Sequence, residues 1–206
     1  MIRDPKDLKR YTASERLNHW TVGMCFILLA LSGLAFFHPA FFPLTQLFGG
    51  PVWARILHPY LGAVMALAFL IIFLRFARLN TMTPADREWL KNAHKMVDGD
   101  DHDMPEQGKY NGGQKVMFWA LALCMAVMTV SGVLIWRAWF GFDITLVRLG
   151  AVAHAAAGAV MIGLIMVHVY AAIWVKGTVR AMWYGTVTRA WARQHHRGWY
   201  RQVTGK

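Results

Sequence analysis

The residues best suited to binding a metal are four histidines set in long apolar stretches. They are His19, His58, His154 and His168. His154 and His168 share one run of residues, 149–175, that contains no acidic or basic side chain. On a helix these two imidazoles would stand about 21 Å apart along the axis and within roughly 40° of each other around it. An ionisable side chain inside a membrane span indicates a functional site. The alternative for a single histidine is a hydrogen bond to a neighbouring helix.

The composition is that of an integral membrane protein. Of the 206 residues, 56% are hydrophobic and 10 are tryptophan, and we expect a single domain covering residues 1–206. The formal net charge of +11 lies in the flanks of the apolar stretches. Membrane lipid and membrane orientation therefore explain this charge better than nucleic acid does.

Four apolar stretches are each long enough to cross a bilayer as a helix. The expected spans are residues 17–37, 52–76, 113–136 and 149–176, with a polar loop at 77–112 and a basic tail at 177–206. No small-residue cleavage site follows the first stretch, so we read it as a retained helix and not as a signal peptide. The predicted fold is an all-α bundle of four transmembrane helices.

The distribution of positive charge predicts the orientation of this bundle. Lys and Arg gather in the N-terminal segment, in the long loop and in the tail, whereas the two short loops have few. By the positive-inside rule, both termini and the long loop are expected in the cytoplasm, and the short loops outside.

The polar segments are expected at the surface. T-P-A-D-R-E-W-L at 83–90 predicts a capped short helix in the long loop. His94 and His102 lie in the same loop and are assigned no ligand role. The tail, rich in Trp and Arg, is predicted to be an interfacial amphipathic segment. His195 and His196 would then be surface residues.

The topology sorts the four membrane histidines into two pairs at matched depth. His58 and His154 each start a helix that enters from outside, so they are predicted near the outer surface. His19 starts a helix that enters from inside, and His168 lies towards the inner end of its helix. Two imidazoles per site are the ligands of a six-coordinate b-type haem. The sequence therefore predicts two haem b groups, the outer held by one pair and the inner by the other.

Other metal chemistry fits the sequence less well. The C-x-x-C-H motif for covalent c-type haem does not occur, and no Cys/His cluster has zinc spacing. A metal-transport path would be expected to add carboxylates or thiolates, but the four expected spans contain no Asp or Glu. Cys25 and Cys124 each lie within an apolar run, so we expect no structural disulfide.

Small residues follow each predicted ligand by four positions, on the same helix face. These residues are Gly23, Gly62, Gly158 and Ala172. A flat macrocycle needs that face cleared, although helix–helix packing also enriches Gly and Ala. The pairs Ser32-Gly33 and Ser131-Gly132 could likewise thin the outer ends of the first and third spans, again with packing as the alternative.

Two arginines lie within about two helical turns of the outer histidines. Arg55 precedes His58, and Arg148 precedes His154. Their guanidinium groups could pair with acidic haem propionates. Plain anchoring at the membrane interface is an equally good explanation.

Five segments, in this order and spacing, resemble the cytochrome b (gamma) subunit of membrane-bound respiratory formate dehydrogenase. They are R-L-N-H-W-T-V at 16–22, R-I-L-H-P-Y-L-G at 55–62, G-K-Y-N-G-G-Q-K at 108–115, H-A-A-A-G at 154–158 and H-V-Y-A-A-I-W-V-K-G at 168–177. The similarity extends over almost the whole chain and includes the tail motif H-H-x-x-W-Y at 195–200.

The resemblance implies a function and a set of partners. In that family the histidines matching the two predicted pairs bind two b haems, and a quinone pocket beside the inner haem uses residues matching Asn111 and Gln114. The second ring nitrogen of His168 would remain a hydrogen-bond donor there. Electrons would come from an iron–sulfur (beta) subunit and a molybdenum or tungsten catalytic (alpha) subunit outside the bacterial inner membrane. They would pass through the outer and then the inner haem to menaquinone or ubiquinone.

The residues alone are also compatible with other functions. The cytochrome b of a membrane-bound hydrogenase or of a thiosulfate reductase would share the haem ligands, but the match at 108–115 favours formate dehydrogenase. A haem-free membrane anchor or a transporter is the alternative from another class. For Asn111, which precedes Gly112-Gly113, capping of the third helix is the alternative to quinone binding.

Overall fold

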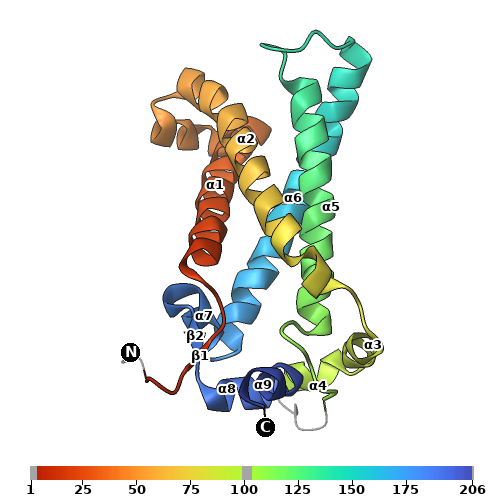
Figure 1. Cartoon of the computed structure of the whole chain (residues 1–206). Helices are drawn as coiled ribbons and strands as arrows, with labels where there is room; N and C mark the ends of the chain where they lie inside the picture. Colours follow the sequence, from red (N-terminus) through yellow and green to blue (C-terminus); the bar gives the residue numbers. More distant parts are fainter. Residues whose placement is uncertain (1–3, 99–103, 206) are drawn as a thin grey trace. The chain divides into compact units, whose positions relative to one another are not determined.

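The computed structural model describes residues 4–98 and 104–205. His102 and most of the acidic run at 98–103 lie outside these described residues. The chain is mainly helical (Figure 1). Its helices are α1 Ala13–Phe37, η1 Pro39–Phe48, α2 Pro51–Phe76, η2 Ala77–Asn80, α3 Pro84–Lys91, α4 Ala93–Asp98, α5 Gly112–Ile135, α6 Ile144–Trp174, α7 Thr178–Tyr184, α8 Arg189–His195 and α9 Arg197–Thr204, and its strands are β1 Leu8–Lys9 and β2 Thr186–Val187.

Four helices are long and apolar enough to cross a membrane: α1, α2, α5 and α6. This confirms the prediction of four transmembrane helices. The fourth helix begins at Ile144, five residues before the predicted start of its span. Asp143 explains the difference, because its side chain accepts a hydrogen bond from the backbone N–H of Thr145 at 2.8 Å. A side chain in that position caps a helix, so Arg148 lies within α6.

The chain divides into two compact units, which are described separately. Unit 1 comprises Met1–Arg16, Arg75–Ala120 and His168–Lys206, and unit 2 comprises Leu17–Leu74 and Leu121–Val167.

Unit 2 is a bundle built from parts of α1, α2, α5 and α6. Its buried core takes side chains from all four helices: Cys25, Met65, Cys124, Met125 and Met161. Both cysteines are free. Outside this core the helices expose large apolar side chains, among them Leu67 and Val152, as expected of surfaces that face lipid. The core holds the helix faces that carry His58 and His154 in register.

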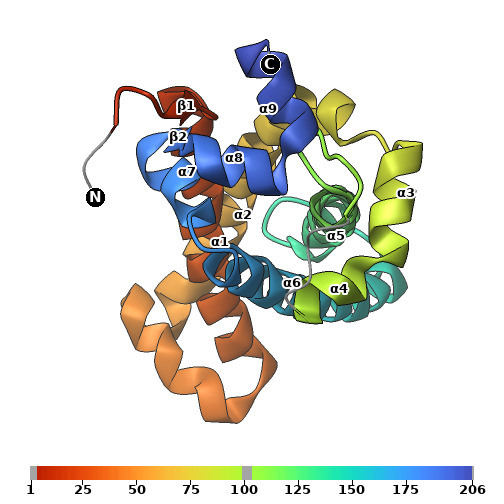
Figure 2. The ribbon, with the colours of Figure 1, turned by 90° about the horizontal axis from the view of Figure 1, so that it is seen from below.

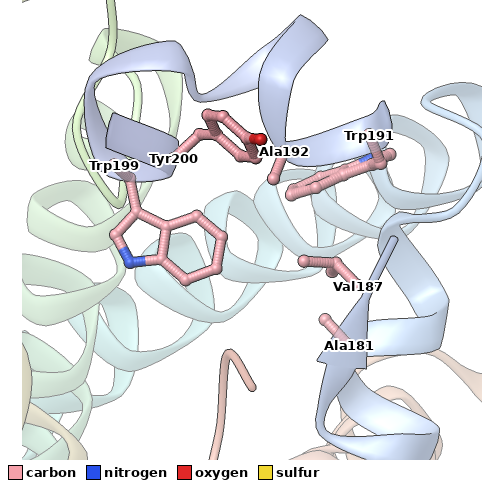
Figure 3. Packing of buried hydrophobic residues seen from close by; sticks show 6 residues of the cluster. All are labelled: Ala181, Val187, Trp191, Ala192, Trp199 and Tyr200. Atoms are coloured by element: carbon pink, nitrogen blue, oxygen red, sulfur yellow. The ribbon is translucent and has the colours of Figure 1, made fainter. Parts of the chain in front are cut away.

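Unit 1 contains a folded tail. The strands β1 and β2 pair in antiparallel fashion, with Leu8 opposite Val187, and lie beside α7 and α8 (Figure 2). The tail also has its own apolar core (Figure 3). This core consists of Ala181, Val187, Trp191, Ala192, Trp199 and Tyr200. These side chains pack against one another and against Leu8, and the position of the tail at the membrane interface stays a prediction.

The N-terminal segment reaches this core through Arg10. The Arg10 guanidinium carbon lies 4.9 Å from the ring centroids of both Trp191 and Trp199, within the range of a cation–π contact. His196 is only 1% exposed, so the prediction of a surface residue is wrong at this position. Its Nδ1 donates to the carbonyl of Gly108 at 2.8 Å. Its Nε2, 3.3 Å from Arg10 Nη2, is then the acceptor.

The buried position of His196 predicts that the tail becomes less stable in acid. Burial, followed by the Arg10 charge, lowers the pKa of His196 to about 3, whereas an unfolded histidine has a pKa of about 6.5. Below about pH 6.5 the unfolded tail therefore binds a proton that the folded tail does not. We expect the stability of the tail to be constant above this pH and to fall as the pH decreases towards 3.

Hydrogen exchange of α8 and α9, corrected for the intrinsic pH dependence, measures this loss. A His196→Gln variant is the matched control, because glutamine can donate to Gly108 and accept from Arg10 without titrating. Its pH slope should be much flatter than that of the wild type. Equal slopes would assign the effect to another group, such as the neighbouring His195.

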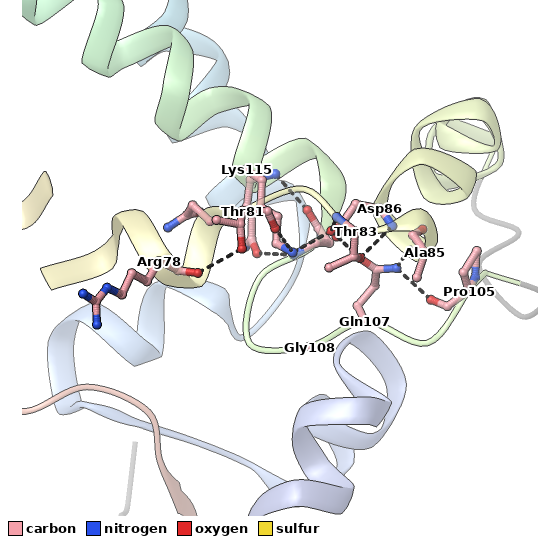
Figure 4. Close-up of polar contacts among 12 residues, drawn as sticks. Arg78, Thr81, Thr83, Ala85, Asp86, Pro105, Gln107, Gly108 and Lys115 are labelled. Carbon is pink, nitrogen blue, oxygen red and sulfur yellow. Dashed lines mark hydrogen bonds and ion pairs between the residues drawn. The ribbon is translucent and has the colours of Figure 1, made fainter. Parts of the chain in front are cut away.

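Part of the long loop is fixed to the start of α5 (Figure 4). Thr83 and Asp86 form the predicted capping box of α3. Lys115, in the first turn of α5, donates to Asp86 Oδ2 at 2.6 Å and to the carbonyl of Thr81 at 3.1 Å. Burial alone would raise the pKa of Asp86, but hydrogen bonds from Lys115 and Thr83 hold it below its usual value. A Cβ on Gly112 would lie 2.6 Å from the carbonyl oxygen of Asp86, so only glycine allows α3 this approach.

Candidate functional site

The structure brings His58 and His154 together inside unit 2. His58 lies on α2 and His154 on α6, and their ring centroids are 6.3 Å apart. A metal bound between two imidazoles lies about 2 Å from each ring nitrogen, which places the ring centroids about 6 Å apart. The observed separation therefore suits two imidazoles that share one metal ion.

Each of these histidines has a serine at its other ring nitrogen. Ser32 Oγ on α1 lies 2.7 Å from His58 Nδ1, and Ser131 Oγ on α5 lies 3.0 Å from His154 Nδ1. Both serines are almost fully buried. With Nδ1 occupied in this way, Nε2 is the nitrogen of each ring that is left for a metal. In the sequence these serines were expected only to thin the outer ends of the first and third spans. The only available signal was the repeated Ser-Gly pair.

Glycines line both histidine rings. A Cβ on Gly33 would lie 3.6 Å from His58 Cε1, and one on Gly132 would lie 3.5 Å from His154 Cε1. Four residues beyond His58, a Cβ on Gly62 would have no heavy atom of the described residues within 4 Å. The corresponding Cβ on Gly158 would contact Met128 Cε at 3.8 Å. The face beside His58 is thus open, as a flat ligand would require.

The other predicted ligand pair is divided between the units. His19, on α1, belongs to unit 2, and His168, on α6, belongs to unit 1. The ring of His19 packs edge-on against Trp20, with the centroids 5.7 Å apart. Gly23, one turn along α1, has no heavy atom of the described residues within 4 Å of the position of a Cβ. The pairing of His19 with His168, and the role of Ala172, stay predictions.

Asn111 and Gln114 cap the start of α5. The backbone N–H of Gln114 donates to Asn111 Oδ1 at 2.9 Å, and that of Asn111 donates to Gln114 Oε1 at 3.1 Å. The structure therefore shows the alternative role, in which these residues cap the third transmembrane helix. The reciprocal cap uses only the side-chain oxygens, so each residue keeps an NH₂ group that can donate to a ligand.

The two arginines predicted near the outer site are both exposed. Arg55 Nε lies 3.4 Å from the carbonyl of Pro51, one turn back along α2. Arg148 lies in the second turn of α6. Pairing with propionates and anchoring at the interface both remain compatible with these positions.

The facing imidazoles of His58 and His154 give unit 2 two candidate metal ligands at one place. Among residues 4–98 and 104–205, no three His, Cys, Asp or Glu side chains gather to hold a metal ion. A haem supplies four nitrogens of its own and needs only two axial ligands from the protein. Two facing imidazoles with open space beside them fit that requirement.

Comparison with known proteins agrees with this geometry. Residues 10–185 match the family model described as prokaryotic cytochrome b561. The chain belongs to this family. Members of a cytochrome b family bind b-type haem, and His58 and His154 are placed to hold one such group. The four apolar helices make the protein a multi-pass membrane protein, and its Escherichia coli relatives indicate the bacterial inner membrane.

Curated relatives of this cytochrome b cover most of its length. It is 47% identical over 196 residues to the formate dehydrogenase cytochrome b556(fdo) subunit of Escherichia coli K12, an alignment of 94% of this chain and 92% of the relative. It is 44% identical to the nitrate-inducible cytochrome b556(Fdn) subunit of the same strain, over 92% of this chain and 88% of the relative. The formate dehydrogenase cytochrome b556 subunit of Haemophilus influenzae is 37% identical, over 94% and 82%.

Proposed function

We propose that this chain is the membrane cytochrome b subunit of a respiratory formate dehydrogenase. The observation that carries the proposal is the facing pair of His58 and His154, with ring centroids 6.3 Å apart, in a chain 47% identical to such a subunit over most of its length. Bound haem iron supplies one-electron transfer. If His58 and His154 both hold the haem, iron bound by two imidazoles would not readily bind a substrate. The chain therefore acts as an electron carrier, and formate is oxidised in a partner subunit.

Two haem groups and two further subunits complete this proposal. His58 and His154 would hold the outer haem, and His19 and His168 the inner one. A carrier of this kind needs a donor at one membrane face, for which an iron–sulfur subunit linked to a molybdenum or tungsten subunit is the proposed partner. Arg55 and Arg148, both exposed at the outer end of unit 2, are proposed to pair with the propionates of the outer haem.

Charge supports an orientation with both termini and the long loop in the cytoplasm. Of the 22 Lys and Arg residues, only three lie in unit 2: Arg55, Arg137 and Arg148. Positively charged segments stay on the cytoplasmic side during insertion. His58 and His154 would then lie near the outer face, close to the electron donor.

Quinone is the proposed electron acceptor at the inner side. Asn111 and Gln114 retain their NH₂ groups after capping α5, and either could donate to a quinone oxygen. A quinone there would take its protons from the cytoplasm, so turnover would build a membrane potential. Because both residues also cap the helix, their substitution should cost about 1 kcal/mol of stability in addition to any effect on quinone.

The test is rapid mixing of the purified complex, first with formate and then with a soluble quinone analogue. In the wild type, formate should reduce two bis-imidazole b haems per chain, and quinone should reoxidise them. Asn111→Ala and Gln114→Ala should slow reoxidation at least about tenfold while leaving haem content and reduction by formate unchanged. Thr188→Ala, which removes the cap of α8, is the control for a lost helix cap.

The possible results distinguish the proposed quinone site from the proposed function of the chain. Reoxidation at the wild-type rate in both variants would place the quinone site elsewhere. Reduction by hydrogen and not by formate would assign the chain to a hydrogenase. Absence of haem in the wild-type complex would contradict the proposed function itself.

A further inference from the structure

Two serine–histidine pairs in unit 2 repeat one arrangement on different helices. In the first pair Ser32 on α1 contacts His58 on α2, and in the second Ser131 on α5 contacts His154 on α6. In both pairs the hydroxyl oxygen lies within 3.0 Å of Nδ1 and not of Nε2. The glycine after each serine lies against Cε1 of the same ring.

The hydroxyl protons have a second partner in each helix. Ser32 Oγ lies 2.8 Å from the carbonyl oxygen of Leu28, and Ser131 Oγ lies 2.6 Å from that of Val127. A carbonyl can only accept, so it takes the one hydroxyl proton. The hydroxyl oxygen is then free to accept from an N–H. Each serine can therefore receive a hydrogen bond from a protonated Nδ1.

This arrangement selects one form of the neutral imidazole. With the proton on Nδ1, the lone pair of the ring is on Nε2. Nε2 is the atom that must be unprotonated to bind iron. A hydrogen bond from Nδ1–H to an oxygen also makes the imidazole a stronger electron donor to the metal.

We propose that Ser32 and Ser131 are positioning residues that hold His58 and His154 as Nδ1–H imidazoles with Nε2 directed to the outer haem iron, and that they lower its midpoint potential. The proposal rests on the proposed function, because it needs a haem between these histidines. Neither serine touches the iron. Each acts through the histidine that it contacts.

A purely local role for the serines explains less of the geometry. Serines in membrane helices commonly donate to the carbonyl four residues earlier, and such a bond needs no histidine nearby. Here both hydroxyls are buried, at 0% and 3% exposure, and each also meets Nδ1 of a different histidine. Two independent helix pairs with the same contact indicate a requirement of the site.

Removal of one hydroxyl should change the haem without unfolding the bundle. In Ser32→Ala the buried Nδ1–H of His58 loses its serine acceptor, and in Ser131→Ala the ring of His154 keeps only a backbone hydrogen bond with Met128. In both variants the ring donates less strongly to iron. Loss of such a partner typically weakens metal binding by about 10- to 100-fold. We expect the affinity of the site for ferric haem to fall about tenfold more than its affinity for ferrous haem. For a one-electron couple this corresponds to a rise of about 59 mV in midpoint potential.

The experiment is a redox titration of the purified complex with haem quantification and low-spin ferric EPR. The variants are Ser32→Ala, Ser131→Ala, the double variant, and the conservative Ser32→Thr and Ser131→Thr. Thr45→Val is the matched control, because the Thr45 hydroxyl is equally buried but donates to the carbonyl of Phe42. The second haem of the chain reports whether the protein is folded.

Three results are decisive. The proposal expects the potential and EPR signal of the outer haem to shift in both alanine variants, further in the double variant, while the threonine variants and Thr45→Val stay close to wild type. An unchanged outer haem in both alanine variants would overturn the proposal and leave the proposed function intact. If His58→Ala retains both haems with unaltered spectra, the outer haem is not at this site, and the proposal fails together with the assignment of His58 as its ligand.

Discussion

Replacement of His58 or His154 with alanine is expected to remove one of the two haems and to stop electron flow from formate to quinone. Each substitution deletes one of two imidazoles whose centroids lie 6.3 Å apart, so the remaining ring can offer only one axial ligand. Loss of a group that hydrogen-bonds to a metal ligand already lowers metal affinity or activity by about 10- to 100-fold. We therefore expect loss of the ligand itself to lower formate–quinone activity by at least about 100-fold.

The measurement is the haem content of the purified complex together with its reduced-minus-oxidised spectrum. Wild-type protein should hold two low-spin haems per chain, and either variant should hold one or show a high-spin signal. His94→Ala is the control, because His94 is an exposed histidine in α4 and should be dispensable. Two low-spin haems in the His58→Ala and His154→Ala variants would rule out this pair as ligands.

The outer histidine pair could be predicted from the sequence because topology alone fixes depth in a membrane. In a helix that must span about 30 Å of hydrocarbon, a histidine near the start can lie only near one membrane surface. His58 and His154 both lie in the first half of helices predicted to enter from the same side, and the structure does bring their rings together. The same reasoning pairs His19 with His168, and that pairing stays a prediction.

The serine contacts could not be predicted because they depend on how each helix is rotated about its axis. Ser32 is 26 residues from His58, and its sequence neighbourhood is equally suited to close packing of helices. A hydroxyl that bonds its own helix leaves no periodic signal. The repeated Ser-Gly pair marked the position but did not specify the partner.

The apolar core of the tail could not be predicted for a related reason. Amphipathic helices that lie on a membrane and helices that pack on a protein have the same pattern of apolar and basic residues. Trp191 and Trp199 are buried in one core, and Arg10, far away in the sequence, contacts both rings. Such a long-range partner is invisible to any local pattern.

Substitution of Lys115 by methionine is expected to release α3 from the start of α5. Lys115 is 6% exposed and Asp86 is 2% exposed, and the ion pair between them measures 2.6 Å. Loss of one partner leaves the other charge buried without compensation, which costs about 3–5 kcal/mol. Asp86 would still accept two hydrogen bonds from Thr83, which offset part of this cost. We expect α3 to open about 10²- to 10³-fold more often.

Hydrogen exchange of α3 in the purified complex measures this opening, because a helix of eight residues is not stable alone. Arg201→Met is the matched control. Its ion pair with Glu106 is 2.8 Å long and lies in the same unit, but the two side chains are 58% and 43% exposed. An exposed pair contributes about 0–1 kcal/mol, so exchange of α3 should hardly change in that variant. Equal exchange of α3 in both variants would show that burial of the Lys115–Asp86 pair is not what holds α3 in place.

Release of α3 should also alter the proposed quinone site. Gly112 lies against the carbonyl of Asp86, and the cap formed by Asn111 and Gln114 starts at the residue before it. If α3 supports this cap, Lys115→Met should slow reoxidation by quinone as Asn111→Ala does. Arg201→Met should leave the rate unchanged. Faster exchange of α3 with a normal reoxidation rate would show instead that α5 holds its own cap without α3.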